Sequence, residues 1–500
     1  MGQYNLIDEQ WIPVRDLEGN RKELGIRDVL LTAENLSVIE DPSPLVTAAI
    51  HRFLLAVLYR ALRGPCDIDE AKKLFTEGLP KDKIRAYLNE WKDRFWLFDE
   101  KYPFGQNPNI PESEVEPWTK LTVEYNSTSN KVLFDHTDTR NPCERTFAEC
   151  GRWLLAIMSF SVSGGRGYYP SPSPNAVICF PMGRTLEETL LYSLVPQNLN
   201  VLMNDLPIWE KSSPQLPIPK LKRMAAGYAD LYTWPARFVL LKQQSSGNVK
   251  FVRFVAGEGF EKDSRLLDPM QSYRKNDEHG LLPIQFKERG FWRDFQSILP
   301  DGEGVPPKNL ENAIELTRRQ RARMPGSVVV LGLRNEPPSA NLEFWRMERF
   351  VLPEALAGDR CVGKDIRTML EEAEDTSKSL YSACAGFAEA SLSHGDRKPD
   401  KGDSKKFIAQ MPSLSSYWTI LELKFHAILR DYTLECNPDN IHHDWLVCVR
   451  QALQDGWNLH EQSVCASDAW TIRAMVKASE IIKRKTIELN KSIKQLKEGA

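Results

Sequence analysis

The pattern of apolar and polar residues divides the chain into two parts with different predicted structures. In the first part, apolar side chains recur three and four residues apart over 44–62 behind Pro44, which predicts a buried helix. The run 5–14 predicts a strand that opens a hairpin, because turn-forming residues follow at 16–20. Other elements predicted in this part are a helix near 143–162 and strands at 176–180 and 238–242.

After residue 353 the chain consists of long amphipathic stretches separated by polar breaks, which predicts helices joined up and down in a bundle. The predicted helices are 365–392, 405–433, 441–464 and 467–497. In the last helix, apolar residues that recur every seven positions predict the side that faces the core: Met475, Ile482, Leu489 and Leu496, with Ile472 and Ile493 beside them.

Together these elements predict an α+β protein with two domains. We expect residues 1–358 to form a large mixed α/β N-terminal domain with irregular loops, and residues 359–500 to form a C-terminal four-helix bundle. A length of 500 residues exceeds what one hydrophobic core usually organises, which agrees with this division.

The composition is that of an ordinary globular protein, with 27% charged residues, 42% hydrophobic residues and a net charge of -3. Contact with a nucleic acid would therefore need local basic patches or partner subunits. The N-terminus lacks the pattern of a secretory signal, and no uninterrupted apolar stretch is long enough to span a membrane. We expect a cytoplasmic protein without a membrane partner.

Motifs for catalysis or cofactor binding are missing from the sequence. The nine cysteines are scattered without C-x-x-C spacing, so neither a disulfide framework nor a zinc site is predicted. Phosphate-binding and dinucleotide-binding glycine patterns are absent. In His442-His443-Asp444, neighbouring side chains point about 100° apart on a helix and cannot converge on one metal ion. We therefore expect no catalytic residue, no metal and no cofactor.

Several short stretches, spread in order along the chain, carry a resemblance to a known family. These stretches are 5–14, 51–56, 91–95, 102–104, 164–167, 234–236, 268–269 and 332–335, followed by the helical region. In this order and spacing they resemble the CasA family, the large subunits of type I-E CRISPR Cascade complexes. The resemblance extends over essentially the whole chain.

The resemblance implies a non-catalytic subunit of an RNA-guided surveillance complex used in antiviral defence. Such a subunit recognises the protospacer-adjacent motif in double-stranded DNA, promotes strand opening and R-loop formation, and serves as a platform for nuclease recruitment. The implied partners are guide RNA, double-stranded target DNA, the backbone, small and guide-capping Cascade subunits, and a helicase-nuclease or other effector nuclease. Base pairing supplies the sequence information, and the protein supplies the point where pairing begins.

The resemblance also implies which residues recognise the flanking motif. A glycine-rich loop matches Gly164, Gly165, Arg166 and Gly167, since glycine lets a backbone approach a groove closely and arginine suits a narrow, electronegative minor groove. The alternative interpretation of this cluster is a tight turn after a helix. A lysine that contacts the flanking duplex matches Lys262.

A strand-separating wedge is implied on a hairpin that matches 334–341. The glutamine expected there is absent, so an asparagine amide together with a stiff, apolar proline pair could take its place. The wedge residues are Asn335, Pro337, Pro338, Ser339, Ala340 and Asn341.

Two further nucleic-acid contacts are predicted. The resemblance implies a guide RNA loop in which Phe134 stacks on an exposed base, with Lys131 and His136 beside it; an ordinary surface loop is the alternative. In the last helix, basic residues on the side away from Met475 could meet DNA phosphates or could simply face solvent: Arg473, Lys477, Arg484 and Lys491.

Two rival functions stay open from the sequence. One is a purely architectural subunit of the same ribonucleoprotein, in which the loops serve assembly alone. The other is a nucleic-acid-processing enzyme with an unrecognised carboxylate site, which would cleave nucleic acid in the presence of a metal ion.

Overall fold

The chain divides into two compact units, which we describe separately. The structure is a computed structural model that describes residues 2–126, 131–132, 134–164, 167–211, 222–262, 266–302, 304–320, 324–335, 340–358, 361–393, 398–464 and 469–499. Unit 1 comprises 1–291 and 304–349, and unit 2 comprises 292–303 and 350–500. This division differs in two places from the predicted domain ranges, 1–358 and 359–500, which remain a prediction about functional domains.

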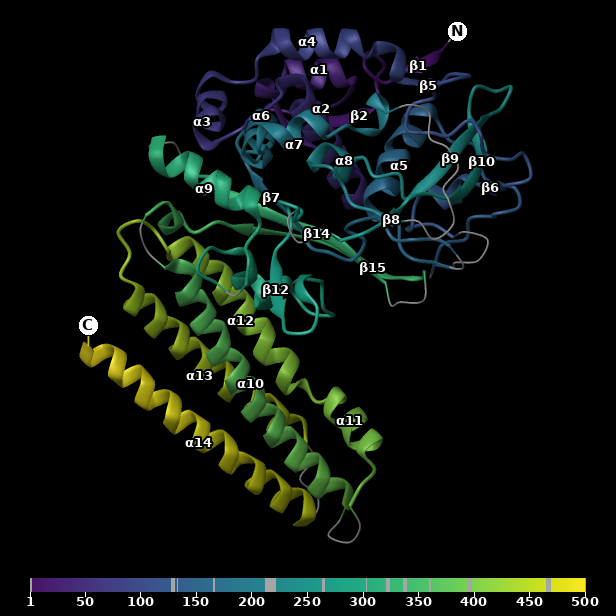
Figure 1. Ribbon diagram of the computed structural model, residues 1–500. Helices are drawn as coiled ribbons and strands as arrows, with labels where there is room; N and C mark the ends of the chain where they lie inside the picture. The colour runs from purple at the N-terminus through teal and green to yellow at the C-terminus, as the bar shows by residue number, and fades with distance from the viewer. Residues whose placement is uncertain are drawn as a thin grey trace. The chain divides into compact units, whose positions relative to one another are not determined.

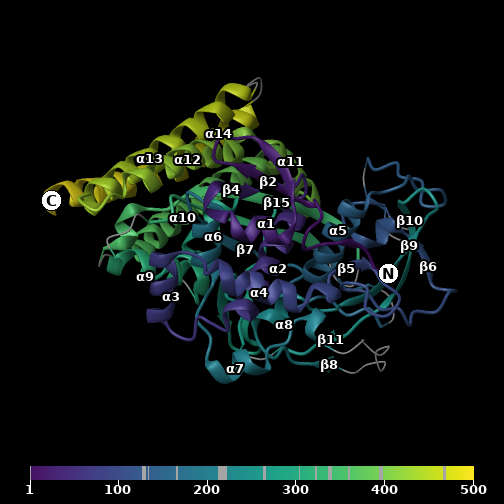
Figure 2. The ribbon, with the colours of Figure 1, turned by 90° about the horizontal axis from the view of Figure 1, so that it is seen from above.

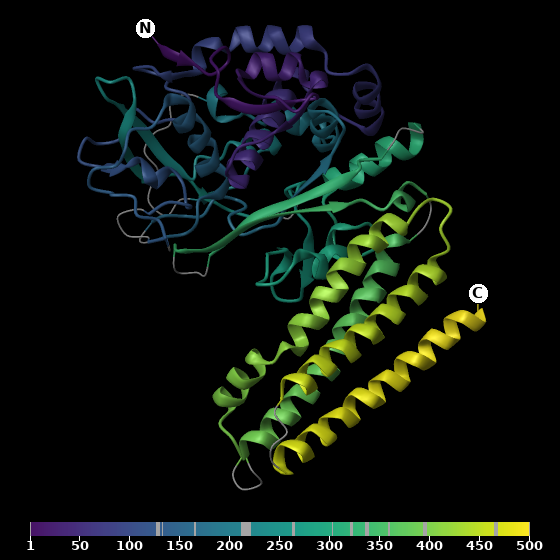
Figure 3. The same cartoon turned by 180° about the vertical axis from the view of Figure 1, so that it is seen from behind.

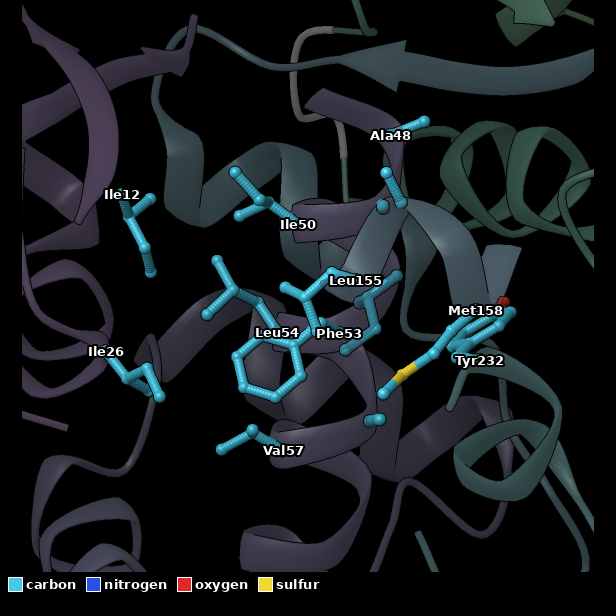
Figure 4. Close-up of a cluster of buried hydrophobic side chains, with 14 of the residues drawn as sticks. Ile12, Ile26, Ala48, Ile50, Phe53, Leu54, Val57, Leu155, Met158 and Tyr232 are labelled. Carbon is cyan, nitrogen blue, oxygen red and sulfur yellow. The ribbon is translucent and has the colours of Figure 1, made fainter. Parts of the chain in front are cut away.

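Unit 1 is built around one buried helix, α2 (Pro44–Leu62). Its N-terminus is capped by the Ser43 side chain, which accepts a hydrogen bond from the Val46 N–H, and Pro44 occupies the first turn. Side chains are buried on all sides of α2, and Phe53 lies against the rings of Trp11, Phe104 and Trp209. Figure 4 shows part of this core around Phe53 and Leu54. The predicted buried helix is confirmed.

Four of the other described helices of unit 1, α4, α5, α6 and α8, pack against α2 (Figure 1). Among them, α5 begins with a capping box in which the Thr146 hydroxyl and the Glu149 carboxylate accept each other's backbone N–H groups. The described helices besides α2 are α1 (Ile26–Leu31), α3 (Ile68–Glu77), α4 (Lys81–Glu90), α5 (Phe147–Phe160), α6 (Leu186–Ser193), α7 (Leu199–Asn204), α8 (Tyr228–Tyr232) and α9 (Lys308–Gln320).

The strands of unit 1 form several small sheets rather than one large one. Three-stranded sheets have the orders β3-β2-β4, β6-β10-β9 and β15-β14-β7, and Figure 2 shows β6, β9 and β10 together. Their strands are β2 (Ile12–Asp16), β3 (Arg21–Leu24), β4 (Leu36–Ile39), β6 (Val115–Pro117), β7 (Ile178–Met182), β9 (Arg237–Gln243), β10 (Val249–Ala256), β14 (Ser327–Asn335) and β15 (Leu342–Val351). Two-stranded pairs join β1 (Gln3–Asn5) to β5 (Trp96–Phe98), β8 (Lys222–Arg223) to β11 (Gly259–Phe260), and β12 (Tyr273–Asn276) to β13 (Gly280–Pro283).

The predicted opening hairpin exists, but its first strand is shorter than the predicted run 5–14. The chain turns after Asn5, whose side-chain oxygen accepts the Ile7 N–H, and β2 begins only at Ile12. Leu6 and Ile7 are apolar because they are buried in this turn, not because they belong to a strand.

Unit 2 is a helical bundle (Figure 3). The predicted helix 405–433 is two helices in the structure, because Met411 is extended and Pro412 starts a new first turn. The helices are α10 (Val362–Ser393), α11 (Lys401–Gln410), α12 (Pro412–Asp431), α13 (Pro438–Ser463) and α14 (Ala469–Gly499). Four long helices thus make the bundle, and α11 is a short addition before α12, so the predicted fold class is confirmed.

A short segment, 292–303, belongs to the core of unit 2 although unit 1 residues precede and follow it. Trp292 contacts the rings of Trp418 and Phe425, with centroids 5.7 and 5.3 Å apart. Phe295 packs between Phe350 and Phe425. These aromatic contacts explain why the compact units differ from the predicted ranges.

Helix α2 is long and apolar enough to cross a membrane by length and composition, but most of it is buried inside unit 1. Its His51 is a core residue. The His51 Nδ1 lies 2.8 Å from the Thr47 carbonyl oxygen, and burial lowers the pKa of the imidazole to about 4.

Candidate nucleic-acid interface

The glycine cluster follows α5, and the described residues on its two sides, Gly164 and Tyr168, are joined by a backbone hydrogen bond. The chain leaves α5 at Ser161 in an extended conformation, and the Gly164 N–H donates to the Tyr168 carbonyl oxygen at 3.5 Å. Gly167 has a φ of +86°, a backbone angle that residues with a side chain rarely adopt. Gly165 and Arg166 lie outside the described residues. The described part of the cluster is therefore a tight turn, which is compatible with both interpretations of the sequence.

We call the segment from Gly164 to Tyr168 the glycine turn. Its first residue approaches the hairpin formed by β14 and β15. A Cβ atom placed on Gly164 would lie 2.9 Å from the Cβ atom of Ala340, closer than real Cβ contacts allow. Gly164 is therefore glycine because the hairpin occupies the space of a side chain. The structure brings together two segments that the sequence analysis proposed separately.

Of the two asparagines proposed for the wedge, only Asn341 is exposed. Asn335 ends β14 and is only 4% exposed, so its side-chain amide is buried. Its backbone N–H donates to the side-chain oxygen of Asn175. The Asn335 amide is therefore not presented to solvent. Ala340 is half-buried beside Gly164, and the remaining predicted wedge residues lie outside the described part of the chain: Pro337, Pro338 and Ser339.

A cavity of about 480 Å³ lies beside the glycine turn and the hairpin. Gly164 and Ala340 both line it, together with aromatic and charged residues. The Tyr168 and Phe254 rings stack with centroids 6.1 Å apart. The aromatic and charged residues that line this cavity include Glu116, Tyr168, Arg237 and Phe254.

Lys262 is exposed and lines a second cavity, of about 460 Å³, which Tyr169 also lines. Lys222 lines the same cavity, and its ammonium group lies 5.3 Å from the centre of the Tyr169 ring. The two lysines come together because β8 pairs in parallel with β11, which aligns Lys222 with Gly259. This cavity therefore carries two cations next to the residue that follows the glycine turn.

The predicted guide RNA loop is exposed where it is described. Phe134 is 86% exposed and has a φ of +66°, and Lys131 and His136 are also exposed. The loop is held by Asp135, which accepts hydrogen bonds from Asn126 and Thr137. Burial raises the pKa of the Asp135 carboxyl, but these hydrogen bonds outweigh it and lower the pKa below its usual value. Phe134 has no structural role in the described core that would explain its aromatic ring.

The four predicted basic residues of the last helix are all exposed on α14: Arg473, Lys477, Arg484 and Lys491. Arg484 pairs with Glu480 at 3.7 Å across one helical turn, and the Arg473 guanidinium lies 5.5 Å from the centre of the Trp470 ring. These partners leave most of the charged groups in water. The exposed side of α14 is therefore basic, as the sequence analysis predicted.

The sequence analysis missed Lys222, Tyr168 and Arg237. Lys222 lies outside any motif, and only the folded chain brings it to the site, whereas Tyr168 directly follows the glycine cluster in sequence and could have been included with it. Arg237 carries a signal that could have been noticed, because it is a charged residue at the start of the apolar strand β9. A charge at a buried strand position usually has a specific partner.

Among the described residues, no group of three or more His, Cys, Asp or Glu side chains could hold a metal ion. In unit 2, His442 forms an ion pair with Glu372 at 2.7 Å, and His443 contacts Asp444. The two histidines thus have separate partners, as expected for side chains that diverge on a helix.

Comparison with known proteins identifies the class of this chain. A sequence profile of the family described as CRISPR-associated protein Cse1 matches residues 5–455. CRISPR-associated protein CasA/Cse1 of Thermus thermophilus is 34% identical over 475 residues, which cover 91% of this chain and 92% of that protein. A crystal structure of CasA from Thermus thermophilus matches with a TM-score of 0.84 at 30% identity, covering 97% of this chain and 100% of that chain.

A chain of a CRISPR RNA-guided surveillance complex has the same fold, with a TM-score of 0.78 at 21% identity; 96% of this chain and 100% of that chain are covered. The α/β unit and the helical bundle together are thus the architecture of a CRISPR-associated protein. The chain belongs to the Cse1 family, whose members are also called CasA. The resemblance noted from the sequence is confirmed.

Proposed function

We propose that this chain is the large, non-catalytic subunit of an RNA-guided type I-E surveillance complex. In this role it recognises the protospacer-adjacent motif in double-stranded DNA, then promotes strand opening and R-loop formation. Membership of the Cse1 family supports this role, as does the fold shared with a chain of a CRISPR RNA-guided surveillance complex.

The observation that carries the proposal is the approach of Gly164 to Ala340. Successive base pairs are about 3.4 Å apart along DNA, so a loop that reads the flank and a wedge that opens the next pair must be neighbours. The glycine turn and the hairpin meet this requirement. Lys262 and Lys222, which line the second cavity, would attract the phosphates of the flanking duplex.

Other parts of the function rest on exposed residues. Phe134, with Lys131 and His136, would contact the guide RNA by stacking and charge. The basic side of α14 would support displaced DNA, and the subunit would offer a platform for a helicase-nuclease or other effector nuclease. Other Cascade subunits complete the complex, and we place it in the cytoplasm.

The test is flank selection by the reconstituted complex. Guide-matched duplexes with a randomised flank are bound and sequenced for the wild type, for Gly164→Ala, and for the double variant Gly164→Ala with Ala340→Gly. The single variant should lose flank selection because its new methyl group displaces the hairpin, and the double variant should regain it because the space returns. Gly326→Ala is the matched control, since nothing lies within 4 Å of its new Cβ atom.

Assembly of each complex is measured separately by size and guide content. Selection by the wild type, loss in Gly164→Ala with assembly intact, and recovery in the double variant would support flank recognition. A wild-type complex without flank preference would refute the proposal. If Gly164→Ala instead blocks assembly and leaves selection unchanged in the complexes that form, the subunit is architectural.

A further inference from the structure

Arg237 is a buried cation at the start of β9 whose hydrogen-bond partners are unusual. It is 8% exposed, and its guanidinium donates to the carbonyl oxygens of Val162, Tyr169 and Ala236. Val162 precedes the glycine turn and Tyr169 follows it. One side chain therefore bridges the two ends of the turn.

The guanidinium is bound by neutral groups rather than by acids. Among the described residues, no carboxylate forms a hydrogen bond or ion pair with Arg237, although Glu116 lines the same cavity. Burial lowers the pKa of the guanidinium to about 10, and the nearby Tyr168 acts in the opposite direction. The group is still protonated near neutral pH, so among the described residues this buried cation is stabilised by carbonyl oxygens and the Tyr168 ring rather than by a carboxylate.

The geometry explains why an arginine is needed here. Its planar fork offers donors in fixed directions, so it can bind carbonyl oxygens on two separate segments at once, whereas a lysine ammonium is a single point. The guanidinium carbon also lies 5.0 Å from the centre of the Tyr168 ring, inside the turn itself. Three contacts thus fix the turn: one at each end and one at Tyr168.

We infer that Arg237 is a positioning residue, which holds Val162 and Tyr169, the residues on the two sides of the glycine turn, in the arrangement that flank recognition requires, without touching DNA itself. The inference rests on the proposed function of the turn. It assigns a role to a residue that lies about 70 positions from the turn in sequence and belongs to no motif.

The contrast with Arg253 sharpens the inference. Arg253 lies on the neighbouring strand β10, and its guanidinium binds the Ile110 carbonyl oxygen and the Glu112 carboxylate. It is an arginine of the same sheet, but it has an acidic partner and its hydrogen bonds go to residues outside the turn. Arg253→Lys is therefore the matched control for Arg237→Lys.

The experiment measures two quantities in the assembled complex for the wild type, Arg237→Lys and Arg253→Lys. The first is amide hydrogen exchange in peptides that cover 161–171, and the second is the ratio of affinities for preferred and other flanks. Arg237→Lys keeps the charge but loses a bridge, so the increase in exchange in these peptides and the loss of flank selectivity should each be about tenfold. Arg253→Lys should change neither quantity.

A chemical rescue separates positioning from general folding. Arg237→Ala leaves a space beside the existing cavity, and methylguanidinium should enter it and restore flank selectivity, whereas methylammonium should not. Selectivity that survives in Arg237→Lys, or faster exchange without any loss of selectivity, overturns the inference while the proposed function stands. A wild-type complex without flank selectivity overturns both, whatever the exchange shows.

Discussion

At the scale of single residues, unit 1 depends on a buried ion pair between helix α2 and a distant loop. The Arg52 guanidinium lies 2.7 Å from the Asp268 carboxylate, and both side chains are almost fully buried. Asp268 also accepts hydrogen bonds from Ser173 and Gln271. Ser173 follows the glycine turn in sequence, so the pair connects the core helix to the neighbourhood of the candidate interface.

We predict that Asp268→Asn lowers the free energy of unfolding by about 3 kcal/mol, because a buried arginine then lacks its counter-charge. Urea titration of the purified chain measures this loss. Asp277→Asn, at an exposed position between β12 and β13, should stay within about 0.5 kcal/mol of the wild type. Equal losses in the two variants would mean that the ion pair is not important.

Phe134 allows a residue-scale prediction about binding. Because its ring is exposed, Phe134→Ala should leave the unfolding temperature of the chain unchanged. If the ring stacks on a guide base, the affinity of the chain for the guide-loaded remainder of the complex should fall about tenfold or more. Phe134→Tyr, which keeps the ring, should bind as the wild type does. Unchanged affinity in Phe134→Ala would remove Phe134 from the guide RNA contact.

At the scale of elements, the core-facing side of α14 shows what a heptad pattern can and cannot predict. Ile482, Leu489 and Ile493 are buried as predicted, but Ile472 is 49% exposed, so that part of the prediction is wrong. The buried row instead continues through Ala474, Ala478 and Lys485. Alanine indicates burial only weakly, because it occurs both in cores and on surfaces. Lysine normally indicates an exposed position, and only the folded bundle reveals that Lys485 pairs with Asp375 of α10 at 2.6 Å.

Lys485 therefore gives a prediction about the bundle. Its partners Asp375 and Glu488 are largely exposed, so they can be hydrated when the lysine is removed. Lys485→Met should change the free energy of unfolding by less than about 1 kcal/mol, whereas Lys485→Ala should cost about 2 kcal/mol by leaving a void. Urea titration distinguishes the two. Equal losses of about 2 kcal/mol in the two variants would show that the charge, which both variants remove, stabilises the bundle.

The pair of His442 on α13 and Glu372 on α10 makes the bundle sensitive to pH. The hydrogen bond to Glu372 raises the pKa of His442 against the opposing effect of burial, and Asp365 and Asp439 contribute in the same direction as Glu372. A raised pKa in the folded state means that the stabilisation is complete below about pH 6.5, the unfolded value, and disappears as the pH rises through the folded pKa.

We predict that the wild type loses about 0.5–1 kcal/mol more stability between pH 6 and pH 8 than His442→Gln does. Thermal unfolding across this range measures the difference. His443→Gln is a suitable comparison, since His443 is paired with its own neighbour Asp444 rather than with another helix. Parallel curves for the wild type and His442→Gln would contradict the prediction.

At the scale of the whole molecule, a net charge of -3 conceals local basic surfaces. The exposed basic residues of α14 belong to unit 2, and Lys222 and Lys262 belong to unit 1, so the proposed attraction for nucleic acid would be local to each unit. Such attraction would be blind to sequence and would weaken with salt, whereas flank discrimination is the role that we propose for the glycine turn and the hairpin.

Replacement of the four basic residues of α14 by glutamine should therefore act on the salt dependence of DNA binding and not on flank preference. For each phosphate that is no longer neutralised, the slope of log affinity against log salt should become less negative by about 0.9. Titrations of the assembled complex at several salt concentrations measure this slope. A control variant replaces four exposed basic residues of α3 and α4 by glutamine: Lys73, Lys81, Lys83 and Arg85. Equal changes in the two variants would mean that α14 has no special role.

The sequence predicted the α+β class, the core helix α2 and the bundle, because each of these depends on local periodicity. It did not predict the approach of Gly164 to Ala340, since nothing in either segment encodes a neighbour that far away in the chain. Each of the two segments was predicted only from the resemblance to the CasA family, and the resemblance did not predict that they are neighbours. The bridge formed by Arg237 could be found only from the coordinates, because its partners are backbone carbonyl groups, which carry no sequence signal.

The aromatic segment 292–303 has a consequence for how the protein is made. A ribosome releases this segment before the rest of unit 2, and the roughly 200 residues that follow take about 10–40 s to synthesise. Until Trp418 and Phe425 have been synthesised, Trp292 lacks both of these aromatic partners, so we expect the nascent chain to expose aromatic surface of the kind that chaperones bind. An isolated bundle expressed from residue 350 onward would lack these rings permanently, so we expect a fragment with 292–303 joined to it to be the more soluble one.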